Sequence, residues 1–402
     1  MNHPLLAKRI TSISESATIA MSQKSRAMKA AGIDVINLSL GEPDFNTPIP
    51  VKSAAKLAID ENYSKYPPIA GYEDLKEAIC KKFEKENNLL FNSSQIIVSI
   101  GAKQCIANVI LSLVNEGDEV ILPAPYWVSY KGLVELAGGE IVELHSDIES
   151  DFKSSATELA AAITHKTKLI IFSSPCNPSG SIYTEKELRE WAEVIEKNQH
   201  IVVLSDEIYE YINFTGAHFS IGSLPTIAEQ VVTVNGVAKG FAMTGWRIGY
   251  MGGPQWLMSA CAKMQGQFTS GANSIAQRAT LSAIIAGKEL SQEMVEAFKQ
   301  RKDLILKLSQ KINHLKVNTP KGAFYVFPDV SYFIGKQFMG RVIESSDTLC
   351  EIILEEGHVA CVGGTSFGAP NNIRISYASS EATIREAMRR IKKVLEDITS
   401  AN

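Results

Sequence analysis

The chain has 402 residues, of which 45% are hydrophobic and 21% charged, and its formal net charge is −4 at pH 7. These proportions are those of an ordinary globular protein, and the slightly acidic balance disfavours a nucleic-acid surface. No stretch approaches the roughly 20 apolar residues of a membrane span, and the first nine residues lack the apolar core of a signal peptide. The cysteines and histidines are scattered, without C-x-x-C or H-E-x-x-H, which predicts reduced thiols, a cytoplasmic protein and no metal site.

Short apolar runs alternate with amphipathic stretches through the middle of the chain. Strands are predicted at 95–100, 118–122, 168–173, 201–205 and 230–234, with helices at 102–114, 129–137 and 185–197. Continuous apolar strands between helices are typical of a parallel sheet covered on both faces. The pattern therefore predicts an α/β core from about residue 50 to 290.

The rest of the chain has a different pattern. The predicted elements are a helix at 289–312, strands at 316–318 and 323–327, a helix at 348–356, a strand at 373–376 and a helix at 381–397. We interpret them as a smaller α+β domain, which an apolar run at 35–40 joins. The predicted division is 1–48 for an N-terminal arm and part of the small domain, 49–300 for the large domain and 301–402 for the remainder.

Polar residues follow the five core strands, where ligands of open α/β sheets bind. They are Gly101, Ala102 and Lys103 after the first strand, Tyr126 and Trp127 after the second, Asn177 after the third, Asp206 and Tyr209 after the fourth, and Lys239 and Arg247 after the fifth. This edge thus combines the start of a helix, a flat aromatic ring, an amide, a carboxylate, a phenol and two cations. Pyridoxal phosphate needs this set.

Each part of that cofactor has a chemical match in the set. Its phosphate suits a helix N-terminus and a cation, here Gly101, Ala102 and Arg247. Its aldehyde needs a lysine for the Schiff base, here Lys239, and its pyridine nitrogen needs a carboxylate to stay protonated, here Asp206. Trp127 offers a flat partner for the ring, and Tyr209 and Asn177 offer hydrogen-bond donors to the phenolic oxygen.

Taken singly, these residues have ordinary explanations. A lysine after a strand is usually a solvated surface side chain, although the small and apolar surroundings of Lys239 would lower its pKa. Asp206 resembles a helix cap, Arg247 a structural ion pair and Trp127 a core aromatic. Their joint order on five successive strand ends favours the cofactor site.

Five motifs, at 41–45, 174–180, 206–209, 239–249 and 373–377, extend this interpretation. In them the chain resembles the class I pyridoxal-phosphate aminotransferases of fold type I, and within that family the bacterial aspartate aminotransferase branch, over nearly its whole length. The resemblance implies a large domain with a mostly parallel seven-stranded sheet and a smaller α+β domain. It also implies a homodimer with shared active sites, in which Tyr66 reaches the phosphate of the neighbouring subunit.

The same resemblance implies roles for individual residues. Lys239 would form the Schiff base and move the substrate Cα proton, and Arg374 would clamp the substrate α-carboxylate. Gly41 would let the substrate approach the backbone. Asn177 and Trp127 would contact both cofactor and substrate. Lys103 would lie beside the cofactor and bind the distal carboxylate of an acidic substrate.

Two departures from the family pattern are present. Gly236 and Ala238 stand where some branches carry hydroxyl groups before the lysine, which predicts fewer side-chain donors to the phosphate. Gly364 stands in a segment where a Pro-Gly pair is expected, which leaves specificity open.

The expected reaction is a ping-pong transfer of the amino group from L-aspartate to 2-oxoglutarate. Ser14 stands where prephenate users are expected to carry a lysine, which disfavours prephenate. The alternatives are an aminotransferase for alanine, methionine, aromatic acids or prephenate, and a related C–S lyase. A cofactor-sensing DNA-binding regulator is disfavoured by the short stretch before the first predicted strand, and a dinucleotide oxidoreductase by the lack of a G-x-G-x-x-G turn.

Overall fold

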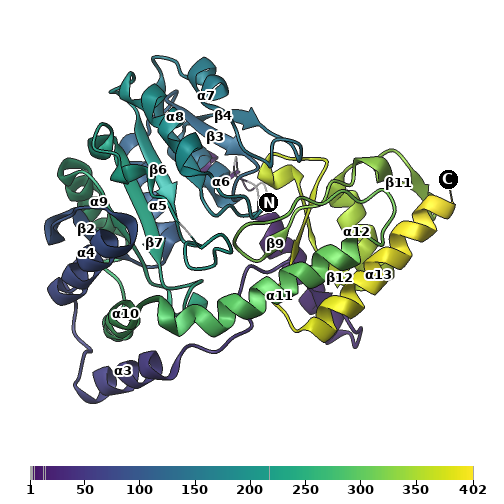
Figure 1. Cartoon of the computed structure of the whole chain (residues 1–402), viewed down its shortest axis with the longest axis horizontal. Helices are drawn as coiled ribbons and strands as arrows, with labels where there is room; N and C mark the ends of the chain where they lie inside the picture. The colour runs from purple at the N-terminus through teal and green to yellow at the C-terminus, as the bar shows by residue number, and fades with distance from the viewer. Residues whose placement is uncertain (1–2, 4, 12, 14, 217, 402) are drawn as a thin grey trace.

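The computed structural model describes residues 3, 5–11, 13, 15–216 and 218–401, and the centre of this part is a seven-stranded sheet (Figure 1). Its strands are β2 (Ile96–Ser99), β3 (Glu119–Ala124), β4 (Glu140–His145), β5 (Thr167–Ser173), β6 (Val202–Asp206), β7 (Val231–Gly236) and β8 (Gly249–Gly252). They lie in the order β2-β8-β7-β6-β5-β3-β4, and every neighbouring pair is parallel except the two that β8 forms. The mostly parallel α/β sheet predicted from the sequence is confirmed.

Two strands of this sheet, β4 and β8, are not predicted from the sequence pattern. β4 lies at the edge of the sheet, and its glutamates interrupt the apolar run. β8 has four residues, two of them glycine, and runs antiparallel between β2 and β7. Neither has the continuous apolar run by which a buried parallel strand is recognised.

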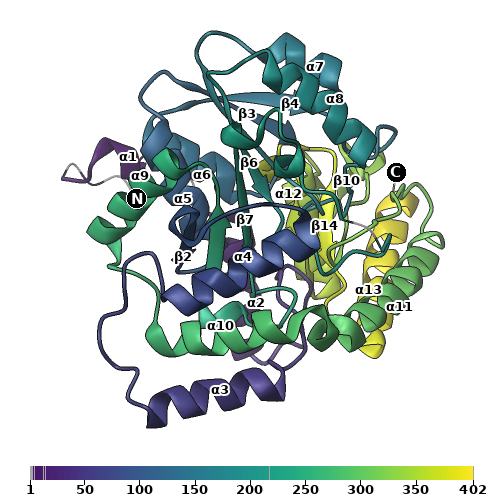
Figure 2. The same ribbon diagram turned by 60° about the vertical axis from the view of Figure 1, so that its left-hand side comes forward.

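Helices cover both faces of the sheet because successive side chains of each strand point to opposite faces. Leu169 and Ile171 of β5 pack on one face, and Ile170 and Phe172 pack on the other. The first face is covered by α5 (Ala102–Leu113), α6 (Ser129–Ala137) and α9 (Gln255–Phe268), and the second by α7 (Ala156–Ala162) and α8 (Glu185–Glu196). Near β2 and β8 pack α4 (Glu73–Asn87) and α10 (Ser274–Ala286), and α3 (Ile49–Asp60) lies against α10 (Figure 2).

A smaller unit combines the two ends of the chain. Its helices are α2 (Ala17–Ala30), α11 (Gln292–Ser309), α12 (Ser346–Gly357) and α13 (Glu381–Ser400), with α1 (Lys8–Thr11) preceding them. Its strands are β1 (Ile36–Asn37), β9 (Tyr325–Val326), β10 (Gln337–Phe338), β11 (Arg341–Val342), β12 (Val359–Ala360), β13 (Val362–Gly363) and β14 (Ile373–Ser376). β1 pairs in parallel with β12, so the N-terminal segment joins the C-terminal one. The division at 48 and 300 remains a prediction.

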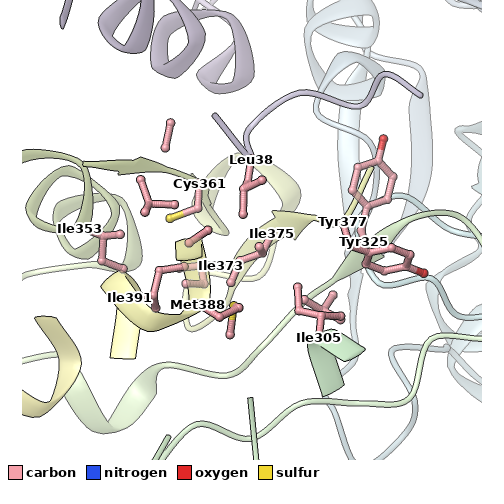
Figure 3. Close-up of a cluster of buried hydrophobic side chains, with 14 of the residues drawn as sticks. Leu38, Ile305, Tyr325, Ile353, Cys361, Ile373, Ile375, Tyr377, Met388 and Ile391 are labelled. Carbon is pink, nitrogen blue, oxygen red and sulfur yellow. The ribbon is translucent and has the colours of Figure 1, made fainter. Parts of the chain in front are cut away.

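Three of the expected elements of this unit are shorter in the structure, whereas α12 and α13 are longer than predicted and β14 has the predicted bounds. The helix expected over 289–312 is a 3-10 segment, Gly287–Ser291, followed by α11. The strand expected at 316–318 is an isolated bridge between Lys316 and Asp329, and the strand expected at 323–327 is only β9, which pairs with β14 over two residues. Buried side chains from most of these elements form one hydrophobic cluster, with Tyr325 and Tyr377 to one side of its aliphatic residues (Figure 3).

Short 3-10 segments lie between the longer elements. Besides Gly287–Ser291, they are Ser93–Gln95, Ile221–Ser223, Ala228–Gln230, Thr244–Trp246, Ser331–Phe333 and Thr365–Phe367. Across the described ranges, no helix has both the length and the apolar character that crossing a membrane requires.

Candidate active site

A cavity of about 240 Å³ lies at the carboxyl ends of the central strands and is also lined by the smaller unit. It brings together every predicted site residue except Gly101 and Tyr66: Gly41, Ala102, Lys103, Trp127, Asn177, Asp206, Tyr209, Lys239, Arg247 and Arg374. The parallel register explains part of this convergence, because Ser173 at the end of β5 lies directly beside Asp206 at the end of β6. Gly101 immediately precedes the lining residue Ala102.

Lys239 lies just after β7, with its side chain in the cavity. Its Nζ donates a hydrogen bond to the carbonyl oxygen of Gly41 at 2.5 Å, and lies 5.7 Å from the centre of the Tyr209 ring. Burial lowers the pKa of Lys239 to about 8, and the charge of Arg374 acts in the same direction. The unprotonated amine is therefore accessible near neutral pH, as a proton-transferring base requires.

Asp206 ends β6 and is buried. Its Oδ2 accepts a hydrogen bond from the hydroxyl of Tyr130 at 2.6 Å, and its Oδ1 accepts one from the backbone N–H of Ile208 at 3.2 Å. Burial raises the pKa of Asp206 to about 6, and the bond from Tyr130 limits that rise. A buried carboxylate in this state gains from a cationic partner, which a protonated pyridine ring provides.

Tyr209 follows Asp206 by three residues and is also buried. Its hydroxyl lies 2.6 Å from the hydroxyl of Tyr325. Burial holds the pKa of Tyr209 well above its usual value, so the phenol keeps its proton and can donate a hydrogen bond. Tyr325 and Tyr130 also line the cavity, although the sequence analysis does not select them. For Tyr325 the sequence signal is a tyrosine within the apolar segment 323–327, since its hydroxyl needs a partner when buried.

An anion cradle forms where α5 begins. Gly101 caps the helix with φ of 78°, and a Cβ there would lie 2.5 Å from Nη2 of Arg247. A Cβ on Gly249 would collide with the backbone nitrogen of Ala102. The two glycines thus let a guanidinium and a helix N-terminus come close together, an arrangement that suits a phosphate.

The missing hydroxyl at position 236 also has a structural reason. Gly236 pairs with Gly249 across β7 and β8, and a Cβ on Gly236 would lie 3.0 Å from the Cα of Gly249. The close approach of the two strands leaves little space for a larger side chain.

Arg374 lies on β14 and is only 2% exposed. Its Nη1 donates to Oδ1 of Asn177 at 2.9 Å and its Nη2 to the carbonyl oxygen of Ser39 at 2.5 Å. Its buried Nε has no hydrogen-bond partner among the described residues. Burial lowers the pKa of Arg374. A buried guanidinium with an unused N–H fits a carboxylate ligand.

Lys103 and Trp127 lie in the same cavity. The Nζ of Lys103 is 5.0 Å from the centre of the Trp127 ring, and that ring makes a T-shaped contact with the ring of Tyr130. Although the Lys103 side chain is exposed at the cavity mouth, partial desolvation lowers its pKa, and the charge of Arg247 adds to the effect. Lys103 thus adds a further cation to Lys239, Arg247 and Arg374 in the cavity.

Tyr66 is a predicted site residue that lies away from the cavity in the single chain. Its side chain is 94% exposed and does not line the cavity. The other observations fit pyridoxal phosphate: the glycine-lined anion cradle, the buried carboxylate of Asp206, the protonated phenol of Tyr209 and the lysine with the lowered pKa.

Comparison with known proteins agrees with this chemistry. Residues 33–391 match the family described as "Aminotransferase class I and II". The bifunctional aspartate aminotransferase and glutamate/aspartate-prephenate aminotransferase of Petunia hybrida is 44% identical, over 98% of this chain and 83% of that protein.

Solved structures give the same result. The aspartate aminotransferase of Rhizobium meliloti has a TM-score of 0.94 at 40% identity, covering 98% of this chain and 99% of that one. The aspartate aminotransferase of Thermus thermophilus, solved with maleate, has a TM-score of 0.90 at 39% identity, covering 98% and 100%. The chain belongs to the class I and II aminotransferase family. It is an aminotransferase that uses pyridoxal phosphate, as the sequence analysis predicts.

Proposed function

We propose that this enzyme transfers the amino group of L-aspartate to 2-oxoglutarate by a ping-pong mechanism. The observation that carries the proposal is that the cavity contains two cations, Arg374 and Lys103, besides Lys239 and Arg247, which we assign to the cofactor. A dicarboxylic amino acid has two carboxylates to bind, one beside its α-carbon and one at the far end. The names of the three relatives support this choice, as does the dicarboxylate maleate in the Thermus thermophilus structure.

Each residue of the cavity has a proposed role that follows from the chemistry of its side chain. When bound, pyridoxal phosphate supplies an aldehyde for the amino group and an electron-poor ring for the electron pair of Cα. Arg374 would bind the α-carboxylate, with Asn177 fixing the guanidinium on one side. Lys239 would take the proton from Cα of the substrate and deliver it to the carbon of the cofactor that carried the aldehyde. Asp206 would keep the ring nitrogen protonated, and Tyr209 would donate to the ring oxygen.

The experiment that tests the substrate is a panel of amino donors assayed with 2-oxoglutarate. Aspartate is expected to be the best donor, ahead of alanine, methionine and phenylalanine. A Lys103→Met variant removes the charge and keeps the apolar stem. Loss of one charged partner, about 1.5–3 kcal/mol, predicts a fall of roughly 10- to 150-fold in kcat/KM for aspartate and a small change for alanine.

The matched control is Lys186→Met, which removes a lysine that is 87% exposed on α8. Equal losses for aspartate and alanine in Lys103→Met would reject the proposed role of Lys103. Release of pyruvate and ammonia from cystathionine would instead indicate the C–S lyase.

Prephenate is a second candidate acceptor. The name of the Petunia hybrida relative includes prephenate, which favours testing it. Ser14, the residue that disfavours prephenate in the sequence, lies outside the described residues. Amino transfer from aspartate to prephenate, measured beside 2-oxoglutarate, decides whether both acceptors are used.

We further propose a homodimer with shared active sites. Tyr66 is exposed, and so are the apolar side chains of Ile49, Ile69 and Phe268, which a second copy would cover. The test combines two variants, Tyr66→Ala and Lys239→Ala, in one mixed dimer. If Tyr66 acts across the interface, the mixture regains activity because one of its two sites is complete. No gain on mixing, with dimers verified by sedimentation, would contradict a shared site.

The proposed location is the cytoplasm. All six cysteines are free in the structure, which supports a reducing compartment. Fractionation of cells that produce the protein, followed by activity assay of each fraction, tests this assignment.

A further inference from the structure

Tyr325 comes from the smaller unit and reaches the cofactor side of the cavity. It lies on β9, directly opposite Ser376 of β14, the strand that carries Arg374. Its ring is fully buried, and the Cζ of Arg374 lies 4.7 Å from the ring centre. Figure 3 shows its ring beside that of Tyr377, to one side of the aliphatic cluster. The position of Tyr325 is therefore set by the core of the smaller unit.

The hydroxyl of Tyr325 meets residues from two other segments. It lies 2.6 Å from the hydroxyl of Tyr209, which follows β6 of the large sheet. A Cβ added to Gly41 would collide with the same hydroxyl, so the backbone at Gly41 passes directly over it. The carbonyl oxygen of Gly41 in turn accepts the hydrogen bond from Lys239. Tyr325 thus connects the substrate clamp, the Gly41 segment and the phenol of Tyr209.

The proton count of two phenols fixes the direction of their hydrogen bond in the working enzyme. Each hydroxyl has one proton to donate and lone pairs with which to accept. If Tyr209 donates its proton to the ring oxygen of the cofactor, it must accept from Tyr325. Hydrogen bonds in such a chain strengthen one another in a buried site.

We propose that Tyr325 is a positioning residue that acts through Tyr209: it donates a hydrogen bond that orients the Tyr209 hydroxyl toward the cofactor ring. The inference rests on the proposed role of Tyr209. It also gives the smaller unit a direct connection to the cofactor, because Tyr325 and Arg374 lie on paired strands.

Tyr325→Phe tests the proposal, because it removes only the hydroxyl. The matched control is Tyr377→Phe, which removes a hydroxyl from the same cluster, where Tyr377 donates to the backbone oxygen of Ala323 at 3.2 Å. Two properties are measured: the affinity of the cofactor-free protein for pyridoxal phosphate, and the pH midpoint of the visible absorbance of the holoenzyme. Tyr325→Phe is expected to weaken the affinity about threefold to tenfold and to move the midpoint. Tyr377→Phe is expected to change neither.

A double-variant cycle with Tyr209→Phe distinguishes an effect of Tyr325 that passes through Tyr209 from a general effect of Tyr325 on the cavity. If Tyr325 acts through Tyr209, adding Tyr325→Phe to Tyr209→Phe changes the affinity and the midpoint no further. Additive effects, or equal effects in Tyr377→Phe, would overturn the inference. A Tyr209→Phe enzyme with wild-type affinity and midpoint would overturn the proposed role of Tyr209 as well. A strong effect of Tyr209→Phe with none for Tyr325→Phe would overturn only the present inference.

Discussion

Two groups of buried polar residues share the segment 206–210 but differ in how completely they are paired. Asp206 and Tyr209 line the cavity, where the Nε of Arg374 lacks a partner among the described residues. Glu207 and Glu210 belong to a second group, which also contains Lys82, Asn87 and His218. The two groups thus alternate along one short stretch of backbone.

The charged groups of this second group are paired with one another, although the buried Nδ1 of His218 has no hydrogen-bond partner among the described residues. Lys82 forms an ion pair with Glu210, and Nε2 of His218 lies 2.7 Å from Oε2 of Glu207. Asn87 donates to both carboxylates, at 3.2 Å to Glu207 and 2.8 Å to Glu210. Burial alone would raise the pKa of Glu210, but the charges of Lys82 and His218 outweigh it and lower that pKa.

The contrast indicates which buried charges stabilise the fold and which await a ligand. One carboxylate oxygen each of Glu207 and Glu210 and one ring nitrogen of His218 lie within 4.8 Å of one another, a spacing that could suit a metal ion. However, the ammonium of Lys82 already pairs with Glu210, and Glu207 already lies against His218 and Asn87. In the cavity, by contrast, the Arg374 guanidinium has a buried N–H without a partner among the described residues. Such an unpaired group lowers the stability of the fold and is typical of functional sites.

The largest expected effect comes from the cavity. Lys239→Ala removes the group proposed to form the Schiff base and to move the proton, so turnover is expected to fall by three orders of magnitude or more, on the order of general-base effects. Coupled assay of 2-oxo acid release measures it, with cofactor binding followed by absorbance. Full turnover in this variant would remove Lys239 from the mechanism.

The second prediction breaks the paired group. Lys82→Met leaves Glu210 buried without its cation, which is expected to cost about 3–5 kcal/mol of unfolding free energy. Denaturant unfolding measures this loss, while kcat of the folded fraction stays near wild type. A matched Lys81→Met variant, on the same helix, is expected to change stability little. A large fall in kcat for Lys82→Met with unchanged stability would contradict the distinction between the two groups.

The third prediction concerns the unused charge of Asp206. Its pKa is raised to about 6 from an ordinary 3.8, so the folded state binds more protons between these values and loses stability as pH rises through that window. About two pKa units correspond to about 3 kcal/mol as an upper bound. Asp206→Asn is therefore expected to stabilise the cofactor-free protein above pH 6 and to weaken cofactor binding. Melting temperatures between pH 4 and 8 test the sign, and a parallel decline in both proteins would refute it.

The smallest expected effect concerns His218. Burial lowers its pKa, but the pairing with Glu207 outweighs burial and raises the pKa above 6.5. The stabilisation is therefore complete below about pH 6.5 and is lost as pH rises through the higher folded value. His218→Gln is expected to flatten the stability profile above pH 6.5 without changing the pH dependence of turnover. The same slope in the variant and the wild type would contradict it.

Much of the fold follows from local sequence. β5 and β6 are recognisable because their apolar side chains fill both faces of a covered sheet, and α6 spans Ser129–Ala137 as predicted. β8 is not recognisable in this way, because a glycine-rich strand is defined by its partner strands, and of the strand predicted at 323–327 the structure keeps only the two residues of β9. The convergence of the proposed cofactor residues in one cavity could be predicted since each follows a strand, and parallel strands bring their carboxyl ends to one edge.

Local sequence was enough to propose the cofactor chemistry, because a lysine, an aspartate, a tyrosine and a helix start each follow a recognisable strand. Tertiary structure alone decided which buried charges are paired, because Lys82 reaches Glu210 across 128 positions of the chain while Arg374 keeps its Nε unused. It also decided that Tyr325 of the smaller unit meets Tyr209 of the large sheet. Hydrogen bonds and ion pairs of this kind depend on distances between segments, and those distances exist only once the apolar faces have packed.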